Sequence, residues 1–278
     1  MLSWNFMKST FFIILTLILV TSCASKSQEL KEKQVGLYFG AGMQNLMDKQ
    51  YTEALKNFLK ANELDPNNSE ILNNLGMSYY FKGEKDLAIK TLNKSLKINE
   101  DNSDAKVNLA SIYFQEKRFE EAEKTYKKVL RDLTYDKQTR TYYNLGVLEL
   151  NHKKDTRAAE AYFKKSIKED DNYCPSYFQL GLIQYNRRQF KTALKNLKEA
   201  SMGDCYESPA PHYYQALSMI NLGRYDEARI KLDEIETHFK KSIFATKARA
   251  KALEISNIES RKTSESHASR KVLESPNF

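Results

Sequence analysis

The sequence lacks the residue patterns that mark common catalytic centres. Its 278 residues contain no H-E-x-x-H pair, no G-x-S-x-G elbow and no glycine-rich phosphate loop of the Walker type. Gly40 and Gly42 have the spacing of a nucleotide-binding loop, but they lie in a segment of helical period with no strand before it. His212 follows Pro209 and Pro211, which favours capping or packing at a helix start. We therefore expect no enzymatic activity, no catalytic residue, no cofactor and no small-molecule substrate.

Long apolar runs are also missing. Residues 11–20 form a run of ten with one polar interruption, whereas a membrane-spanning helix needs about 20 apolar residues. Lys8 precedes the run and small residues follow it, as in a secretory signal peptide. Residues 20–23, Val-Thr-Ser-Cys, resemble a bacterial lipobox, in which cleavage before the cysteine frees Cys23 for acylation by fatty acids such as palmitate. We expect residues 1–22 to be a lipoprotein signal peptide; an ordinary signal peptide that contains a cysteine is the alternative.

Cysteine is scarce, and only Cys174 and Cys205 remain besides Cys23. The two have no nearby His or Asp partners in the sequence, which argues against a metal site. An exported protein works where disulfides are tolerated. A disulfide is therefore the favoured interpretation, and two unrelated thiols are the alternative.

Charge of one sign is not concentrated in any block. The formal net charge is +8, but lysine and glutamate are interspersed, as on solvated helix faces. No run of Lys and Arg forms the footprint of a nucleic-acid site, so we expect no nucleic-acid partner.

Small residues recur with a period of about 34 residues. One series is Gly42, Gly76, Ala110, Gly146, Gly181 and Ala216, and the second is Ala54, Ala88, Ala122, Ala159, Ala193 and Ala228. Turn-prone residues lie between the two series, and an aromatic residue or leucine follows each alanine of the second series by four positions. Small residues let two helices approach closely, and large apolar residues three or four apart form a buried stripe. The period thus predicts a repeated pair of antiparallel helices.

This pattern resembles the tetratricopeptide repeat, in six copies. The resemblance predicts an all-α fold, a right-handed superhelical solenoid of six tetratricopeptide-like helix pairs. The pairs are expected at residues 35–68, 69–102, 103–136, 139–173, 174–207 and 209–242, with an extra residue in the turn of the fourth copy. Residues 243–255 predict a C-terminal capping helix, since the last repeat of an array needs a cover. The solenoid domain then spans 35–255, between a lipidated flexible tether at 23–34 and a disordered polar tail at 256–278.

The phasing of the repeats also bears on the two cysteines. Cys174 opens the first helix of the fifth copy, and Cys205 lies just beyond its second helix. These two ends are neighbours in an antiparallel hairpin, so a structural disulfide is plausible if the Cα atoms lie within about 7 Å.

In repeats of this family, the first helices line a concave surface. Transferring the family's positions gives a protein-binding groove of Phe39, Met43, Met77, Tyr80, Val107, Phe114, Tyr143, Val147, Phe178, Leu182, Tyr185, Tyr213 and Leu217. The Lys and Asn with which some members clamp a peptide carboxylate are absent. The groove is apolar and aromatic, which favours an amphipathic helix or apolar segment of a protein partner. The alternative is that some of these residues are ordinary core between adjacent first helices.

An acylated anchor, a short tether and six such copies together resemble the pilotin lipoproteins of type IV pili, the PilF/PilW/Tgl-like family. The resemblance rests on architecture, not on a motif unique to pilotins. It implies binding of secretin subunits and assistance in their assembly, by a protein exported and lipid-anchored at the periplasmic face of the outer membrane. Ala24 after Cys23 fits outer-membrane sorting. The alternative is a general cell-envelope scaffold or adaptor that serves outer-membrane protein assembly, cell-wall machinery or gliding motility.

Overall fold

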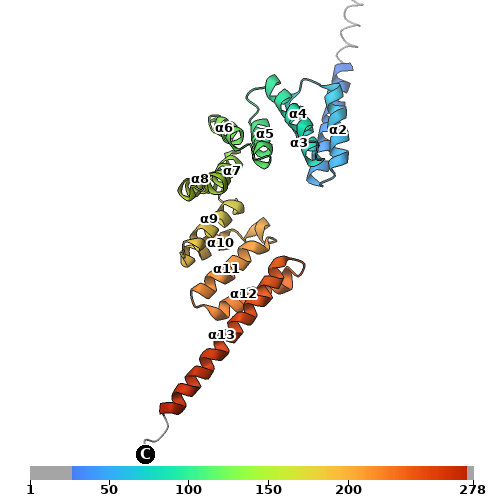
Figure 1. The fold of residues 1–278 in the computed structure, drawn as a ribbon. Coiled ribbons are helices and arrows are strands. Elements are labelled where there is room, and N and C mark those ends of the chain that lie inside the picture. The colour runs from blue at the N-terminus through green and yellow to red at the C-terminus, as the bar shows by residue number, and fades with distance from the viewer. Residues whose placement is uncertain (1–26, 274–278) are drawn as a thin grey trace, which may run out of the picture. The chain divides into compact units, whose positions relative to one another are not determined.

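The computed structural model describes residues 27–273, and over this range it contains helices and turns but no strand (Figure 1). The predicted all-α class is confirmed. A first helix covers residues 27–47. It is followed by α2 (Tyr51–Leu64), α3 (Ser69–Phe81), α4 (Lys85–Ile98), α5 (Ser103–Gln115), α6 (Phe119–Val129), α7 (Gln138–Leu148), α8 (Thr156–Glu169), α9 (Cys174–Asn186), α10 (Phe190–Glu199), α11 (Pro209–Asn221), α12 (Tyr225–His238) and α13 (Ile243–Leu273).

The helices pair as the repeat period predicts. Within five copies the partners are α3 with α4, α5 with α6, α7 with α8, α9 with α10 and α11 with α12, and each pair is in close contact. The helix at residues 27–47 packs on α2 through Phe39 and Met43, which lie against Ala54 and Phe58. The start of α13 packs on α12 and α11, where a capping helix was predicted.

The two series of small residues lie where paired helices cross. All six alanines of the second series are fully buried. A Cβ atom added to Gly146 would lie 2.6 Å from the ring of Phe163, and one added to Gly42 would lie 2.8 Å from the ring of Phe58. The large residue four positions after the alanine therefore fills the space that the glycine leaves open, and close helix packing explains both series.

The chain divides into two compact units between Tyr135 and Asp136, and the extent of a single solenoid domain over 35–255 stays a prediction. We call them the N-terminal unit, with the helix at 27–47 and α2 to α6, and the C-terminal unit, with α7 to α13. Residues 130–137 between α6 and α7 form turns, and Leu133 there is 91% exposed. The spacing of the small residues rises here from 34 to 36, which is the sequence signal of this break.

Both ends of the described range are more helical than predicted. Residues 27–34, expected to belong to a flexible tether, continue the first helix, and residues 256–273, expected to be disordered, continue α13. On the exposed first turns, Gln28 donates to Glu32 and Lys33 to Glu29. Low apolar content argues against a core, but Glu, Lys, Gln and Ala are good helix formers that extend a helix already nucleated by packing. The predicted signal peptide at 1–22, the predicted lipid-attachment residue Cys23, residues 24–26 of the predicted tether and residues 274–278 lie outside the described residues.

The extra residue of the fourth copy lies in a π-helical turn, η1, at Glu149–Lys153. Such single turns accommodate one inserted residue without breaking the helix. Glu149 is buried in this turn and forms an ion pair with Lys153 at 3.1 Å. The following residue, Lys154, adopts a left-handed conformation with φ 59°. The pairing of α7 with α8 is thus kept despite the insertion.

Candidate protein-binding faces

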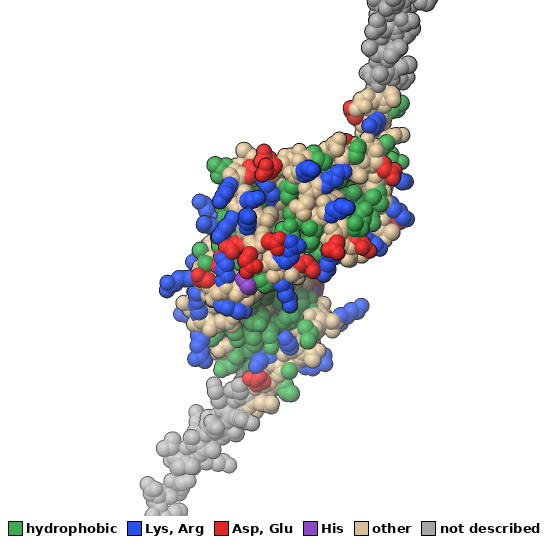
Figure 2. Space-filling model, turned by 45° about the horizontal axis from the view of Figure 1, so that its top comes forward, with side chains coloured by type: hydrophobic (Ala, Val, Ile, Leu, Met, Phe, Trp, Pro, Cys, Tyr) green, Lys and Arg blue, Asp and Glu red, His purple; other side chains and the backbone are tan. Residues whose placement is uncertain are grey.

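The first helices of the C-terminal unit, α7, α9 and α11, carry seven of the residues predicted to line a groove. All seven side chains are half-buried: Tyr143, Val147, Phe178, Leu182, Tyr185, Tyr213 and Leu217. In Figure 2, hydrophobic side chains gather over this unit, next to the grey C-terminal residues. We refer to these seven residues as the C-terminal face.

Aromatic contacts join the C-terminal face across three helices. The ring of Tyr214 on α11 lies 6.1 Å from that of Phe178 and 5.5 Å from that of Tyr185, both on α9, in edge-on geometry. Tyr213 lies 5.5 Å from Phe244 at the start of α13. Such pairs add to area burial, and they fix the spacing of the helices. Tyr214 and Phe244 pack against the face but were not predicted, although the Tyr-Tyr pair on α11 was a visible signal.

The α7 end of the face is built from tyrosines. Tyr143 packs against Phe163 at 5.8 Å and against Tyr173 at 5.5 Å between ring centroids. Burial raises the pKa of Tyr173, and also that of Tyr213, above the ordinary tyrosine value. Both hydroxyls therefore stay neutral at physiological pH, and the face carries no charge from them.

The N-terminal unit carries the other six predicted groove residues. Phe39, Met43, Met77, Tyr80 and Phe114 are half-buried, and Phe39 packs edge-on against Phe58 at 5.7 Å. Val107 is the exception. It is only 3% exposed and belongs to the core, so its assignment to the groove is corrected. Adjacent first helices pack against each other, so some residues at inward-facing positions become core. This is the alternative given in the sequence analysis.

Polar contacts interrupt the first helices of the N-terminal unit. Asn108 on α5 donates to Asn73 on α3 at 2.9 Å, and Asn73 is buried. Ser111 and the buried hydroxyl of Tyr126 lie 3.0 Å apart and share a hydrogen bond. These contacts satisfy polar groups inside the helix stack. The five half-buried residues of this unit, Phe39 to Phe114, are therefore not one continuous apolar strip.

Cys174 and Cys205, the pair predicted from the phasing, form a disulfide with a Cα–Cα distance of 6.3 Å. Cys174 is the first residue of α9, and Cys205 ends the short 3₁₀ turn η2 at Gly203–Cys205, after α10. The bridge closes the α9–α10 hairpin at its open end, and the two cysteines have a sequence separation of 31. A loop of this length adds about 3–4 kcal/mol in the chain-entropy account.

His212 packs at the start of α11, as its neighbouring prolines indicate. Its side chain is 2% exposed, and Nε2 lies 2.9 Å from the carbonyl oxygen of Tyr206. Nδ1 is buried without a hydrogen-bond partner and lies 3.8 Å from a carboxylate oxygen of Glu234. Burial holds the pKa of His212 below its ordinary value. The residue is therefore a neutral core group beside the disulfide-closed hairpin.

Two further findings concern the described residues as a whole. Over residues 27–273, no group of three or more His, Cys, Asp or Glu side chains is arranged to hold a metal ion. Over the same range, every helix is too short or too polar to cross a membrane.

Family comparisons agree with the observed helix pairs. Models described as tetratricopeptide repeats match residues 48–83, 69–102, 102–168 and 212–242. The chain is therefore a tetratricopeptide-repeat protein, a class whose helix stacks serve as protein-interaction modules. A comparison with curated proteins gives no match.

Solved structures with the same fold include two pilus proteins. PilF of Pseudomonas aeruginosa is similar with a TM-score of 0.69 at 20% identity, over 80% of this chain and 99% of that one. PilW, described as a widely conserved type IV pilus biogenesis factor, gives 0.65 at 18% identity, over 77% and 97%. The Cut9–Hcn1 hetero-tetramer of the APC/C gives 0.67 at 18% identity, but only 43% of that chain is covered. At these identities the likeness establishes the fold.

Proposed function

We propose that this chain is a lipid-anchored, non-enzymatic pilotin of type IV pili, which binds an apolar segment of a secretin subunit on its C-terminal face. The observation that carries the proposal is the face itself, since α7, α9 and α11 present seven half-buried apolar side chains over one unit. Apolar grooves between repeats suit an amphipathic helix or an extended apolar segment. The likeness to PilF and PilW over almost their entire lengths supports the choice of partner.

The proposed anchor is acylated Cys23, with the protein held at the periplasmic face of the outer membrane. Three residues separate Cys23 from residue 27, where the described helix begins. Four residue steps span at most about 14 Å. An acylated chain would therefore hold the N-terminal unit close to the bilayer. Replacing Cys23 with serine is expected to release the protein from membranes without loss of helicity, which fractionation and circular dichroism would check.

The test of the partner is complementation of a deletion in the source bacterium. Deletion is expected to abolish secretin multimers on semi-denaturing gels while secretin monomer remains. The wild-type chain should restore them, and Leu182→Gln with Leu217→Gln should not, because both side chains belong to the C-terminal face. The control is Leu87→Gln with Ile230→Gln, which changes exposed leucine and isoleucine on α4 and α12.

The outcomes separate the proposal from its alternative. Intact secretin multimers in the deletion strain would exclude the pilotin. If cell-wall or outer-membrane protein assembly were disturbed instead, the chain would be a general envelope scaffold. Restoration of secretin multimers by the Leu182→Gln with Leu217→Gln variant would exclude the C-terminal face as the contact.

A further inference from the structure

A second surface of the N-terminal unit is unlike the apolar face. Helices α4, α5 and α6 enclose a cleft of about 640 Å³, within the range usual for ligand sites. Five cationic side chains line it: Lys97, Lys106, Lys124, Lys128 and Arg131. The second helix of each pair contributes most of them, so this cleft is distinct from the residues predicted to line the groove.

The carboxylates around the cleft offset only part of its positive charge: five cations and three carboxylates line it, and Asp132 nearby interacts electrostatically with Lys106. Among residues 27–273, none of the five has an ion pair or a hydrogen bond. Of the three carboxylates that line the cleft, Glu121 is taken up by two bonds from Arg118. Glu100 and Asp101 remain at the rim. The cleft therefore carries an excess of positive charge that an anionic ligand would balance.

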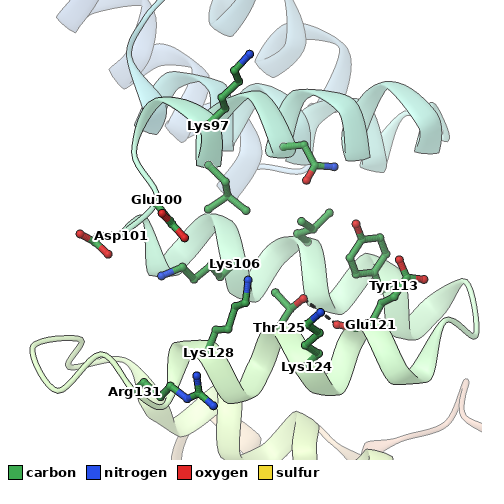
Figure 3. A pocket seen from close by; sticks show the side chains of 13 residues that line it. Lys97, Glu100, Asp101, Lys106, Tyr113, Glu121, Lys124, Thr125, Lys128 and Arg131 are labelled. Carbon is green, nitrogen blue, oxygen red and sulfur yellow. Dashed lines mark hydrogen bonds between the residues drawn. The ribbon is translucent and has the colours of Figure 1, made fainter.

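Figure 3 shows how the central cations lie. Lys128 from α6 points up toward α5, Lys106 from α5 extends toward the side of Glu100 and Asp101, Arg131 lies below Lys128, and Lys97 points away. Lys106 is half-buried. Like charges held together in a concavity cost free energy that a bound anion relieves.

Part of the remaining lining is apolar. Leu96 and Tyr113 are half-buried and Leu109 is buried, and all three line the cleft beside the cations. Inorganic phosphate would leave this area unfilled. A flat membrane surface would meet the exposed cations but would not reach the buried Leu109 inside the cleft. An acidic peptide with an apolar side chain matches both the charges and the apolar lining.

We propose that the α4–α5–α6 cleft binds an acidic segment of a partner protein, with Lys106, Lys128 and Arg131 holding its carboxylates and an apolar side chain against Leu96 and Leu109. This site is separate from the proposed secretin contact. It gives the N-terminal unit a binding surface of its own. Because exposed charges dominate, binding is expected to weaken steeply as salt rises.

The test uses the full chain and a fluorescent synthetic peptide with Asp and Glu on both sides of one Leu. We expect Lys106→Gln with Lys128→Gln to lower its affinity at least tenfold in fluorescence anisotropy. The matched control, Lys191→Gln with Lys195→Gln, removes two exposed charges from α10 and should change affinity less than twofold. Circular dichroism checks folding, and Lys128→Gln with Arg131→Gln replaces the first variant if that fails to fold.

Several results would overturn the proposal. They are no binding of the peptide to the wild-type chain, equal affinity of cleft and control variants, or equal affinity for a peptide whose Leu is replaced by Ser. The last experiment measures binding of the chain to phosphatidylglycerol vesicles. Vesicle binding that depends on Lys106 and Lys128, without peptide binding, would identify a lipid headgroup as the ligand instead.

Discussion

The two units use equivalent repeat positions in opposite ways. In the N-terminal unit, the fifth position of one copy and the sixth of the next are Asn73 and Asn108, which share a hydrogen bond of 2.9 Å. In the C-terminal unit, the same two positions are Phe178 and Tyr214, whose rings pack at 6.1 Å. The repeat scaffold therefore places the residue pair, and side-chain chemistry decides whether the inner surface is polar or aromatic.

The units also differ in covalent and titratable groups. Over the described residues, the C-terminal unit holds the disulfide of Cys174 and Cys205, and all four histidines of the sequence fall in its half of the chain. The N-terminal unit has the cationic cleft between α4, α5 and α6. One repeat thus supports two surfaces of different chemistry, and perturbing one unit should leave the other as an internal reference.

Removing the disulfide should have the largest effect, and only in the C-terminal unit. Cys174→Ser with Cys205→Ser is expected to lower the free energy of unfolding of α9 to α11 by about 3–4 kcal/mol, because the bridge limits the unfolded chain. Hydrogen exchange read by mass spectrometry reports each unit separately. Peptides from α2 to α6 serve as the control. Equal loss of protection in both units, or none in α9 to α11, would contradict the expected confinement.

Breaking the asparagine pair should have the next largest effect, in the N-terminal unit. Asn108→Ala leaves the buried carbonyl oxygen of Asn73 without its donor, at a cost of about 1–3 kcal/mol. Replacing both, as Asn73→Leu with Asn108→Leu, removes the unpaired group and should lie within about 1 kcal/mol of the wild type. Hydrogen exchange in α3 and α5 gives the measurement. A double variant no more stable than Asn108→Ala would show that the polar contact itself is required.

Sequence reasoning reached the fold because close helix packing needs small residues at fixed positions. Gly42, Gly146 and the buried alanines could be found by spacing alone, and so could the hairpin ends that Cys174 and Cys205 occupy. The division at residues 130–137 was not predicted, since a spacing of 36 in place of 34 reads as a longer turn. The helical structure of residues 27–34 and 256–273 was not predicted, because an exposed helix has no periodic pattern of hydrophobic residues.

The binding faces were predicted less well, for a physical reason. Family positions identify which helix face looks inward, but not how far a neighbouring helix covers it, so Val107 was placed in the groove although it is core. Tyr214 was missed because it occupies the sixth position of its copy, which the family pattern does not assign to the groove, although its ring packs on α9 of the preceding copy. The cationic cleft combines α4, α5 and α6, and scattered lysines in a sequence give no sign that three helices bring them together.

Acid should destabilise the C-terminal unit through His212. Burial lowers the pKa of His212 in the folded state, while Lys231 and His238 disfavour its cationic form and Glu234 favours it. The unfolded chain therefore binds a proton first, and stability present above about pH 6.5 is lost as pH falls towards the folded pKa. His212→Gln should flatten this dependence in thermal unfolding between pH 7.5 and about 5.

The control for the acid effect is His238→Gln, which changes a more exposed imidazole next to Glu207. Because His238 also acts on the charge of His212, the His212→Gln, His238→Gln double variant is measured alongside it. An unchanged slope in His212→Gln would mean that other groups cause the acid sensitivity.

The smallest effect tests a feature that the units share. The turn inside each pair has one left-handed residue, Gly83 or Gly223 in two copies, but Lys49, Lys117, Lys154 and Arg188 in the others. A side chain costs about 1–2 kcal/mol in this conformation, and glycine gives part of that back through its greater freedom when unfolded. Lys117→Gly and Arg188→Gly should each stabilise their own unit by about 0.5–1 kcal/mol, measured by unit-resolved hydrogen exchange. Equal gains in stability in the two units would show that the units differ in their surfaces and not in their turns. A loss of stability at either position would mean that the Lys or Arg side chain there makes packing contacts which glycine removes.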